Sequence, residues 1–286
     1  MSDYDEFGDE KFTQRKGKRK PKVTRRVKEL VGKGDGTKGD GTKGDGAKVK
    51  FDDPDLQTLF ERGVLSELLW QMQSGKDATV YAAEGPKGKL AAKIYADPRA
   101  RTFRRDEIYR EGRFVSRGRF KKAMQQAGRT GLPAEHILWV EDEFRALQTL
   151  HRAGILVPRP VAHAGSVILM GYIGDEHPAP RLADAQLSAA EAADAFEQSL
   201  SHLAAMLRLG LVHGDYSTFN LLWWQGSVVV IDLPQMVKLK ESKHAGELLE
   251  RDVQSLLKSF RSFGIEAELL EVLREVKARA KGTPEA

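Results

Sequence analysis

Three polar residues in the second half of the chain have the chemistry to bind a metal ion and to orient a proton. The segment "LVHGDYSTFN" (211–220) contains Asp215 and, five residues later, Asn220, whereas Asp232 follows the apolar run "VVVI". A carboxylate such as Asp215 can orient a hydroxyl group, and the amide oxygen of Asn220 and the carboxylate of Asp232 suit a divalent cation. Phosphoryl transfer from ATP needs this combination, because a metal neutralises phosphate charge while another group positions the attacking oxygen.

A lysine and a glutamate in the first half complete this hypothesis. Lys93 is surrounded by apolar residues in "LAAKIYA" and can reach the phosphates. An acid on the helix expected after residue 133 is needed to hold the lysine, and Glu141 and Glu143 are the candidates. Glu143 is preferred because it lies at the edge of the apolar face, next to Phe144, while Glu141 is expected in solvent.

Each of these residues alone also has an ordinary structural interpretation. A His-Gly-Asp tripeptide is usually a turn, an asparagine is often a cap, and an aspartate after a strand can begin a loop. Lys93 can extend to solvent from an edge strand, and we expect His213 to be a packed, hydrogen-bonded residue rather than a proton carrier. The combination of a lysine in a β-rich half, Asp-x4-Asn and a strand-end aspartate is typical of a protein-kinase site.

The first half of the chain is predicted to contain a helix and a β-meander. Apolar residues at helical spacing from Leu56 to Leu68 follow an Asp-Pro start and predict the helix. Alternating or β-branched segments then predict antiparallel strands at 68–74, 78–85 and 89–96, with "GPKGK" (85–89) as the turn between the last two. Residues 97–133 are polar and Arg-rich, which indicates a long, partly mobile insertion.

The second half is predicted to be mainly helical. Apolar residues at 137, 140, 144, 147 and 150 predict a helix, and two short strands follow in "VPRPVAHAGSVILMGYIG" (157–174). A long amphipathic helix is expected between Ser188 as N-cap and Gly210 as stop. A hairpin of "NLLWWQ" with "SVVVIDL" and two closing helices come next. The boundary between the halves is expected near 171–174.

The composition excludes several classes of protein. With 286 residues, of which 41% are hydrophobic, the chain can bury a core and form one or two domains. The absence of cysteine excludes disulfides, thiolate catalysis and zinc sites built on sulfur, and it permits a reducing cytoplasm. No apolar run has the length of a membrane span, and "MSDYDEFGDE" does not resemble a signal peptide. We therefore expect a cytoplasmic protein without membrane contact.

Residues 1–50 are expected to be a disordered, basic, Gly/Lys-rich tail. They carry 15 Lys/Arg and 9 Asp/Glu, which is more than the whole net charge of +5, so the basicity does not lie in residues 51–286. The repeat "GDGTKGDGTKGDGAK" has no apolar face. The basic segment 15–28 is typical of a contact with RNA, including ribosomal RNA, or with an acidic partner, and equally of a solubilising tail.

The chain resembles the RIO family of atypical serine/threonine protein kinases over about residues 56–265. The motifs that carry the resemblance are "SGKDATVYAA" (74–83), "LAAKIY" with Lys93, "WVEDEFRAL" with Glu143, "AGILVPRP" (153–160), "LVHGDYSTFN" and "VVVIDLPQMV". The resemblance implies an α+β, two-lobed kinase-like fold without a long activation segment. Its antiparallel β N-lobe would span 51–171, including the insertion 97–133, and its mainly helical C-lobe would span 172–286.

The resemblance also implies a Ser/Thr kinase that binds ATP with Mg²⁺ or Mn²⁺ and phosphorylates proteins, itself included. The implied site comprises catalytic Asp215, Lys93 and Glu143, metal-binding Asn220 and Asp232, and the nucleotide-binding residues Ser74, Gly75, Lys76, Val80, Lys93, Met170, Gly171 and Ile173. Two alternatives stay open. One is an ATPase that drives ribonucleoprotein assembly, and the other is a small-molecule phosphotransferase of the aminoglycoside-kinase type, which shares an "HGD" loop.

Four departures from kinase patterns bear on this expectation. The phosphate loop has one glycine, Gly75, so Ser74 and Lys76 are expected to contact phosphates directly. Gly214 stands where kinases usually have an arginine that reads a phosphorylated activation loop, so control by that route is not expected. Gly171 replaces an acidic connector residue, and Pro234 stiffens the metal loop.

Overall fold

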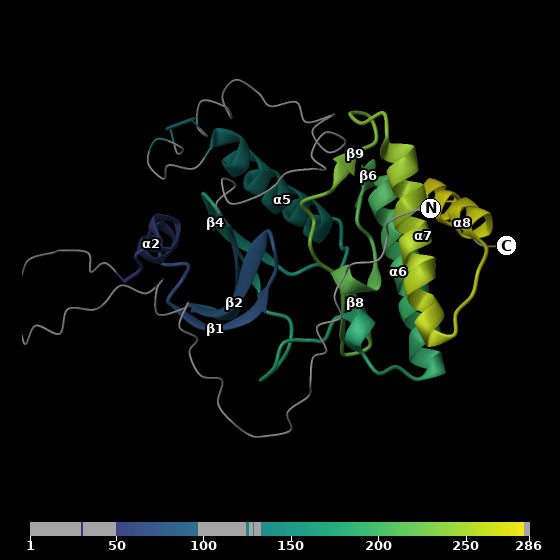
Figure 1. The fold of residues 1–286 in the computed structure, drawn as a ribbon, viewed down its shortest axis with the longest axis horizontal. Helices are drawn as coiled ribbons and strands as arrows, with labels where there is room; N and C mark the ends of the chain where they lie inside the picture. Colours follow the sequence, from purple (N-terminus) through teal and green to yellow (C-terminus); the bar gives the residue numbers. More distant parts are fainter. Residues whose placement is uncertain (1–29, 31–49, 97–123, 126–127, 129–132, 283–286) are drawn as a thin grey trace, which may run out of the picture.

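The computed structural model describes residues 30, 50–96, 124–125, 128 and 133–282, which form a sheet part and a helical part (Figure 1). The sheet part contains five strands and the helices α2 and α5. The helical part contains α6, α7 and α8 together with short hairpins, and these hairpins lie between its helices and the sheet (Figure 1). This arrangement agrees with the expected two-lobed α+β fold.

The five strands form one antiparallel sheet in the order β1-β2-β3-β5-β4. Their bounds are β1 Glu67–Ser74, β2 Ala78–Gly85, β3 Gly88–Tyr95, β4 Pro160–Ala164 and β5 Val167–Gly171. The predicted meander is confirmed, and the turn between β2 and β3 joins Gly85 and Gly88, which face each other in the register. Because β3 pairs with β2 and β5, Lys93 lies on an inner strand rather than on the edge.

The first predicted helix is shorter than its apolar pattern. Helix α2 spans Pro54–Glu61, and the Asp53 carboxylate caps it by accepting hydrogen bonds from two backbone N–H groups at its start. Gly63 then adopts a left-handed conformation (φ +65°), which ends the helix. Leu65 and Leu68 are buried beyond this turn, and Leu68 lies in β1. Their helical spacing was therefore a misleading signal.

Helix α5, Ala134–Arg152, connects the two parts of the molecule. The face predicted from the apolar spacing is buried, as expected. Its first half packs Val140 and Phe144 with Tyr95 and Ile168 of the sheet. Its last turns, with Leu147 and Leu150, belong to the core of the helical part.

The helical part follows the predicted order of elements. Its helices are α6 (Ala189–Arg208), α7 (Ala245–Phe260) and α8 (Leu269–Lys281). Two short antiparallel pairs lie between α6 and α7 in the sequence: β6 (Leu211–Val212) with β9 (Val237–Lys238), and β7 (Leu221–Trp224) with β8 (Ser227–Val230). The short 3₁₀ helices are η2 (Leu182–Asp184), η3 (Thr218–Asn220) and η4 (Arg261–Phe263). Ser188 caps α6 as predicted, in a reciprocal box in which its backbone N–H donates to Glu191 at 2.8 Å.

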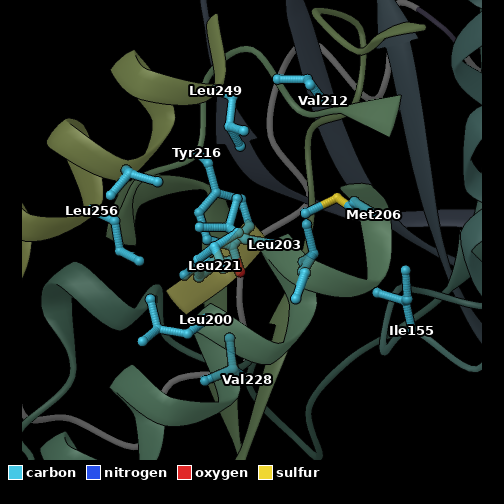
Figure 2. Packing of buried hydrophobic residues seen from close by; sticks show 14 of the residues in the cluster. Ile155, Leu200, Leu203, Met206, Val212, Tyr216, Leu221, Val228, Leu249 and Leu256 are labelled. Atoms are coloured by element: carbon cyan, nitrogen blue, oxygen red, sulfur yellow. The ribbon is translucent and has the colours of Figure 1, made fainter. Parts of the chain in front are cut away.

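The core of the helical part includes a residue from the predicted catalytic loop. Figure 2 shows Tyr216 among Leu200, Leu203, Leu249 and other apolar residues of this cluster. Tyr216 is fully buried, and its hydroxyl donates a hydrogen bond to the carbonyl of Ser199 at 3.2 Å. The loop that carries Asp215 is therefore anchored in the core by the next residue along the chain.

Several predictions concern residues outside the described part of the chain. These are the repeat and the basic segment 15–28 of the tail, and nearly all of the insertion 97–133. Of the tail, Leu30 and Lys50 are described, and both contact the sheet part: the Leu30 carbonyl accepts from Asp52 N at 3.1 Å, and Lys50 N donates to the Gln57 side chain at 3.0 Å. Within the described ranges, no helix combines the length and apolarity needed to cross a bilayer.

Candidate functional site

A pocket of about 410 Å³ lies between the sheet part and the loops of the helical part. The sheet part contributes residues of β1, β2, β3 and the β1–β2 loop, and the helical part contributes the loops around β7 and β8. The predicted site residues that line the pocket are Gly75, Lys76, Val80, Lys93, Glu143, Met170, Gly171, Ile173, Asp215, Asn220 and Asp232. The fold thus brings these residues, which are far apart in the sequence, into one cavity.

Lys93 joins the two parts of the site through two ion pairs. Strand alternation places Ala91, Lys93 and Tyr95 on the pocket face of β3. The Lys93 Nζ atom lies 2.7 Å from Glu143 Oε1 on α5 and 2.6 Å from Asp232 Oδ1 after β8. Glu141 instead pairs with Arg145 at 2.8 Å on the surface of α5. The preference for Glu143 over Glu141 thus agrees with the geometry.

The pKa values of this triad follow from burial and from their mutual charges. Burial alone would lower the pKa of Lys93, but the carboxylates of Asp232 and Glu143 raise it overall, so the amine stays charged. Burial raises the pKa of Glu143 in spite of the nearby lysine. Burial also acts on Asp232, but the positive charge of Lys93 outweighs it and lowers the pKa of this carboxyl. Asp232 therefore remains an anion at neutral pH.

Asp215 and Asn220 lie close together at the mouth of the pocket. The Asn220 Nδ2 atom donates hydrogen bonds to Asp215 Oδ2 at 2.9 Å and to the Asp215 carbonyl at 2.8 Å. This arrangement fixes the Asp215 carboxylate and leaves the Asn220 amide oxygen as an acceptor. Together with the Asp232 carboxylate, whose side chain is 42% exposed, it supplies two oxygen ligands of the kind that hold Mg²⁺ beside phosphate groups.

Asp232 has an unusual backbone conformation for a residue with a side chain. Its φ angle is +62°, in the left-handed region that residues other than glycine rarely adopt. Such a conformation costs on the order of 1–3 kcal/mol, and residues of this kind cluster at functional sites. The fold thus holds the Asp232 carboxylate beside Lys93 at an energetic cost.

A buried aspartate on α7, which the sequence motifs did not reveal, holds the loop that carries Asp215 in place. Asp252 is 1% exposed and accepts hydrogen bonds from the backbone N–H groups of Gly214 at 2.8 Å and Tyr216 at 2.9 Å. Arg251 donates to the Gly214 carbonyl from the same helix. A signal was present in the sequence, since Asp252 stands on the apolar face of α7, four residues before Leu256.

Gly214 has a steric reason to be glycine. Its φ angle is +85°, and a Cβ atom there would lie 2.6 Å from the carbonyl oxygen of Gln235. The loop that carries Asp215 therefore packs closely at this residue against the loop that follows Asp232. The preceding His213 is buried and structural, as expected, with its Nε2 atom 3.3 Å from the Ile231 carbonyl and its Nδ1 atom accepting from Asp215 N at 3.3 Å.

Ser74 is the predicted site residue that the structure does not place in the pocket lining. It pairs with Thr79 in the β1–β2 register, and the two hydroxyl oxygens lie 3.5 Å apart. Because Val80 faces the pocket, its neighbour Thr79 points to the other face of the sheet, and Ser74 lies beside Thr79. The structure thus does not place Ser74 among the residues that line the pocket, and its direct contact with phosphate stays a prediction.

Comparison with known proteins agrees with this geometry. Residues 79–272 match the family model described as RIO domain. The chain is 34% identical to serine/threonine-protein kinase RIO1 of Caenorhabditis elegans over 221 residues, which are 76% of this chain and 42% of that protein. It is 33% identical to the human protein of the same name over 198 residues, which are 68% of this chain and 33% of that protein.

An archaeal protein is matched over more of its length. The RIO-type serine/threonine-protein kinase Rio1 of Haloferax volcanii is 32% identical over 226 residues, which are 76% of this chain and 72% of that protein. The chain thus spans less than half of the nematode and human relatives but most of the archaeal one. The matched region contains Lys93, Glu143, Asp215, Asn220 and Asp232, since all five lie within 79–272.

Proposed function

The chain belongs to the RIO domain family, and from this we propose that it is an ATP-dependent serine/threonine protein kinase. The observation that carries the proposal is the pair of bonds from Lys93 Nζ to Glu143 and Asp232, at 2.7 and 2.6 Å, in a pocket that Asp215 and Asn220 also line. The names of the nematode, human and archaeal relatives state the same activity for those proteins.

Each residue then has a separate task in phosphoryl transfer. Lys93, held by Glu143, neutralises charge on the nucleotide phosphates, and Asp215 orients the acceptor hydroxyl and accepts its proton. Asn220 and Asp232 hold a divalent cation through their side-chain oxygens. When bound, Mg²⁺ or Mn²⁺ supplies further neutralisation of the phosphate charge. The apolar residues Val80, Ala91 and Met170, which line the pocket from the sheet, are suited to contact the adenine base.

A labelling experiment tests the proposal. The full chain is incubated with γ-labelled ATP, with and without a cell extract, beside Asp215→Ala, Asp232→Ala and, as a surface control, Lys258→Gln. We expect acid-stable label on serine or threonine of a protein, including the chain itself, with wild type and the control and not with the two aspartate variants. Release of label only as free phosphate, or its transfer to a small hydroxylated metabolite, would replace the proposal with an ATPase or a small-molecule phosphotransferase.

We propose two further properties that rest on composition. The basic segment 15–28 binds RNA phosphates, and deletion of residues 1–48 should then remove salt-sensitive RNA binding. The protein acts in the cytoplasm, where a chain without cysteine needs no oxidising conditions to fold. A fluorescent fusion expressed at native level tests the location.

A further inference from the structure

Arg181 is a cationic residue of the pocket wall that the predicted site did not contain. It follows the connector between the two parts of the molecule and lines the same cavity as Lys93 and Asp215. Its backbone is held on the side of the helical part, because Arg181 forms a β-bridge with Leu222, which also lines the pocket. The next residue, Leu182, is fully buried in the helical core. The bridge to Leu222 and the burial of Leu182 therefore fix the backbone position of Arg181.

The charged side chains that line the pocket differ in whether they pair with a residue of opposite charge. Among the described residues, its lining contains the cations Lys76, Lys93 and Arg181 and the carboxylates Asp77, Glu143, Asp215 and Asp232. Lys93 bonds to two of these carboxylates. The Arg181 guanidinium, in contrast, forms no hydrogen bond or ion pair with any residue in the described part of the chain. A half-buried guanidinium of this kind has its donors available for a ligand.

The location of the Arg181 charge indicates which part of a ligand it meets. Its bridge partner Leu222 stands two residues after Asn220, and Trp223 N donates to the carbonyl of Pro180 at 3.0 Å, so Arg181 lies beside the segment that carries Asn220. The groups suited to a base are the apolar residues Val80, Ala91 and Met170. A guanidinium is a planar, positively charged fork of donors, and it matches the anionic oxygens of a phosphate better than a neutral base or a sugar hydroxyl.

We propose that Arg181 binds the phosphate groups of the nucleotide from the side of the helical part. This inference rests on the proposed function, since it assumes that the pocket binds ATP. Lys76 in the β1–β2 loop is the corresponding cation of the sheet part. Phosphates held by both residues would connect the two parts of the molecule independently of the bond between Lys93 and Asp232.

Binding of nucleotides that differ in phosphate number tests the proposal. The dissociation constants of ATP, ADP, AMP and adenosine are measured by calorimetry on the full chain, for wild type, Arg181→Gln and Arg181→Lys. We expect Arg181→Gln to weaken ATP binding about tenfold, ADP binding less, and adenosine binding not at all. Arg181→Lys, which keeps the charge but not the fork, should fall between the two. Raised salt should reduce the difference between wild type and variant for ATP.

Control variants distinguish an effect of Arg181 on phosphate binding from a general loss of charge or of folding. Arg261→Gln removes the same charge from an exposed position of η4, outside the pocket lining, and should bind all four ligands as wild type does. Thermal unfolding without ligand shows that Arg181→Gln and Arg181→Lys remain folded. Equal weakening for adenosine and ATP, or unchanged ATP binding in Arg181→Gln, would overturn the inference while leaving ATP binding intact. Failure of wild type to bind any nucleotide would overturn the proposed function and this inference with it.

Discussion

The two parts of the molecule hold their functional side chains in different ways. In the sheet part, Lys93 and Glu143 lie on a strand and a helix, are 10% and 6% exposed, and bond directly to each other. In the helical part, Asp215 and Asn220 lie in a loop at the pocket mouth, and the buried carboxylate of Asp252 fixes the backbone beside them. Charge pairing therefore positions the first group, and backbone hydrogen bonds position the second. Substitutions should separate these two modes.

The largest expected effect concerns Asp215, the exposed residue that we propose as the proton acceptor. Asp215→Asn keeps the size of the side chain but removes the carboxylate proposed to accept the hydroxyl proton. We expect phosphoryl transfer to fall by about 10²- to 10⁴-fold, with the unfolding temperature and ATP affinity close to wild type. Initial rates of label transfer and calorimetric binding measure the two quantities. A variant that kept half of the wild-type rate would contradict the role of Asp215.

The second effect concerns the backbone anchor of the helical part. Asp252→Ala leaves the N–H groups of Gly214 and Tyr216 without their acceptor in a buried environment. Each such loss costs about 1–3 kcal/mol, so we expect the free energy of unfolding to fall by about 2–6 kcal/mol. Urea unfolding measures it. The neighbouring Glu250→Ala, at an exposed position of α7, should change stability by less than about 0.5 kcal/mol.

The third effect tests charge pairing in the sheet part. Glu143→Gln removes one of the two carboxylates bonded to Lys93, so the amine loses its fixed position relative to α5. We expect kcat/KM to fall by about 10- to 100-fold. Glu141→Gln is the matched control, because its surface pair with Arg145 contributes less than about 1 kcal/mol. Equal losses in the two variants would show that the bond of Glu143 to Lys93 has no special role.

The smallest effect concerns a buried titratable group of the helical part that lacks a charge partner. Burial lowers the pKa of His202 from 6.5 to about 4, and its Nδ1 atom has no hydrogen bond within the described chain. The folded state therefore binds no proton at His202 at pH 5, whereas the unfolded state does. The stability that this group contributes is present above pH 6.5 and is lost as the pH falls toward 4.

The resulting prediction is a difference in pH dependence. Between pH 7.5 and pH 5.0, wild type should lose about 1–2 kcal/mol of unfolding free energy through His202. His202→Gln should not show this part of the loss. His151→Gln, at an exposed position near the end of α5, should keep the wild-type pH dependence. Identical pH profiles for wild type and His202→Gln would contradict the assignment.

Features that depend on neighbours in the sequence were predictable. The Ser188 cap of α6 forms with Glu191, three residues away, and the buried face of α5 follows from apolar spacing alone. Lys93, Asp215, Asn220 and Asp232 were recognisable because their combination and order are typical of a protein-kinase site, although each alone has an ordinary interpretation. The geometry that brings them into one pocket agrees with that expectation.

Features that depend on distant contacts were not predictable in the same way. Asp252 acts on Gly214 and Tyr216 across more than 30 residues, and only its place on an apolar helix face distinguished it from a surface aspartate. Arg181 has an ordinary sequence context, and its proximity to the pocket arises from the bridge to Leu222. The position of Ser74 outside the pocket lining was not predictable either, because motif order does not show which face of a strand a side chain occupies.

The two bonds of Lys93 have a consequence for the motion of the molecule. Glu143 and Lys93 adjoin one buried cluster, formed by Tyr95, Val140, Phe144 and Ile168, so they move together when the sheet part moves. Asp232 belongs to the other side, on the loop after β8. If the sheet part moves away from the helical part, we expect the 2.6 Å bond to Asp232 to break while the 2.7 Å bond to Glu143 is kept. The separation of the two parts and the availability of the Asp232 carboxylate for a cation should therefore change together.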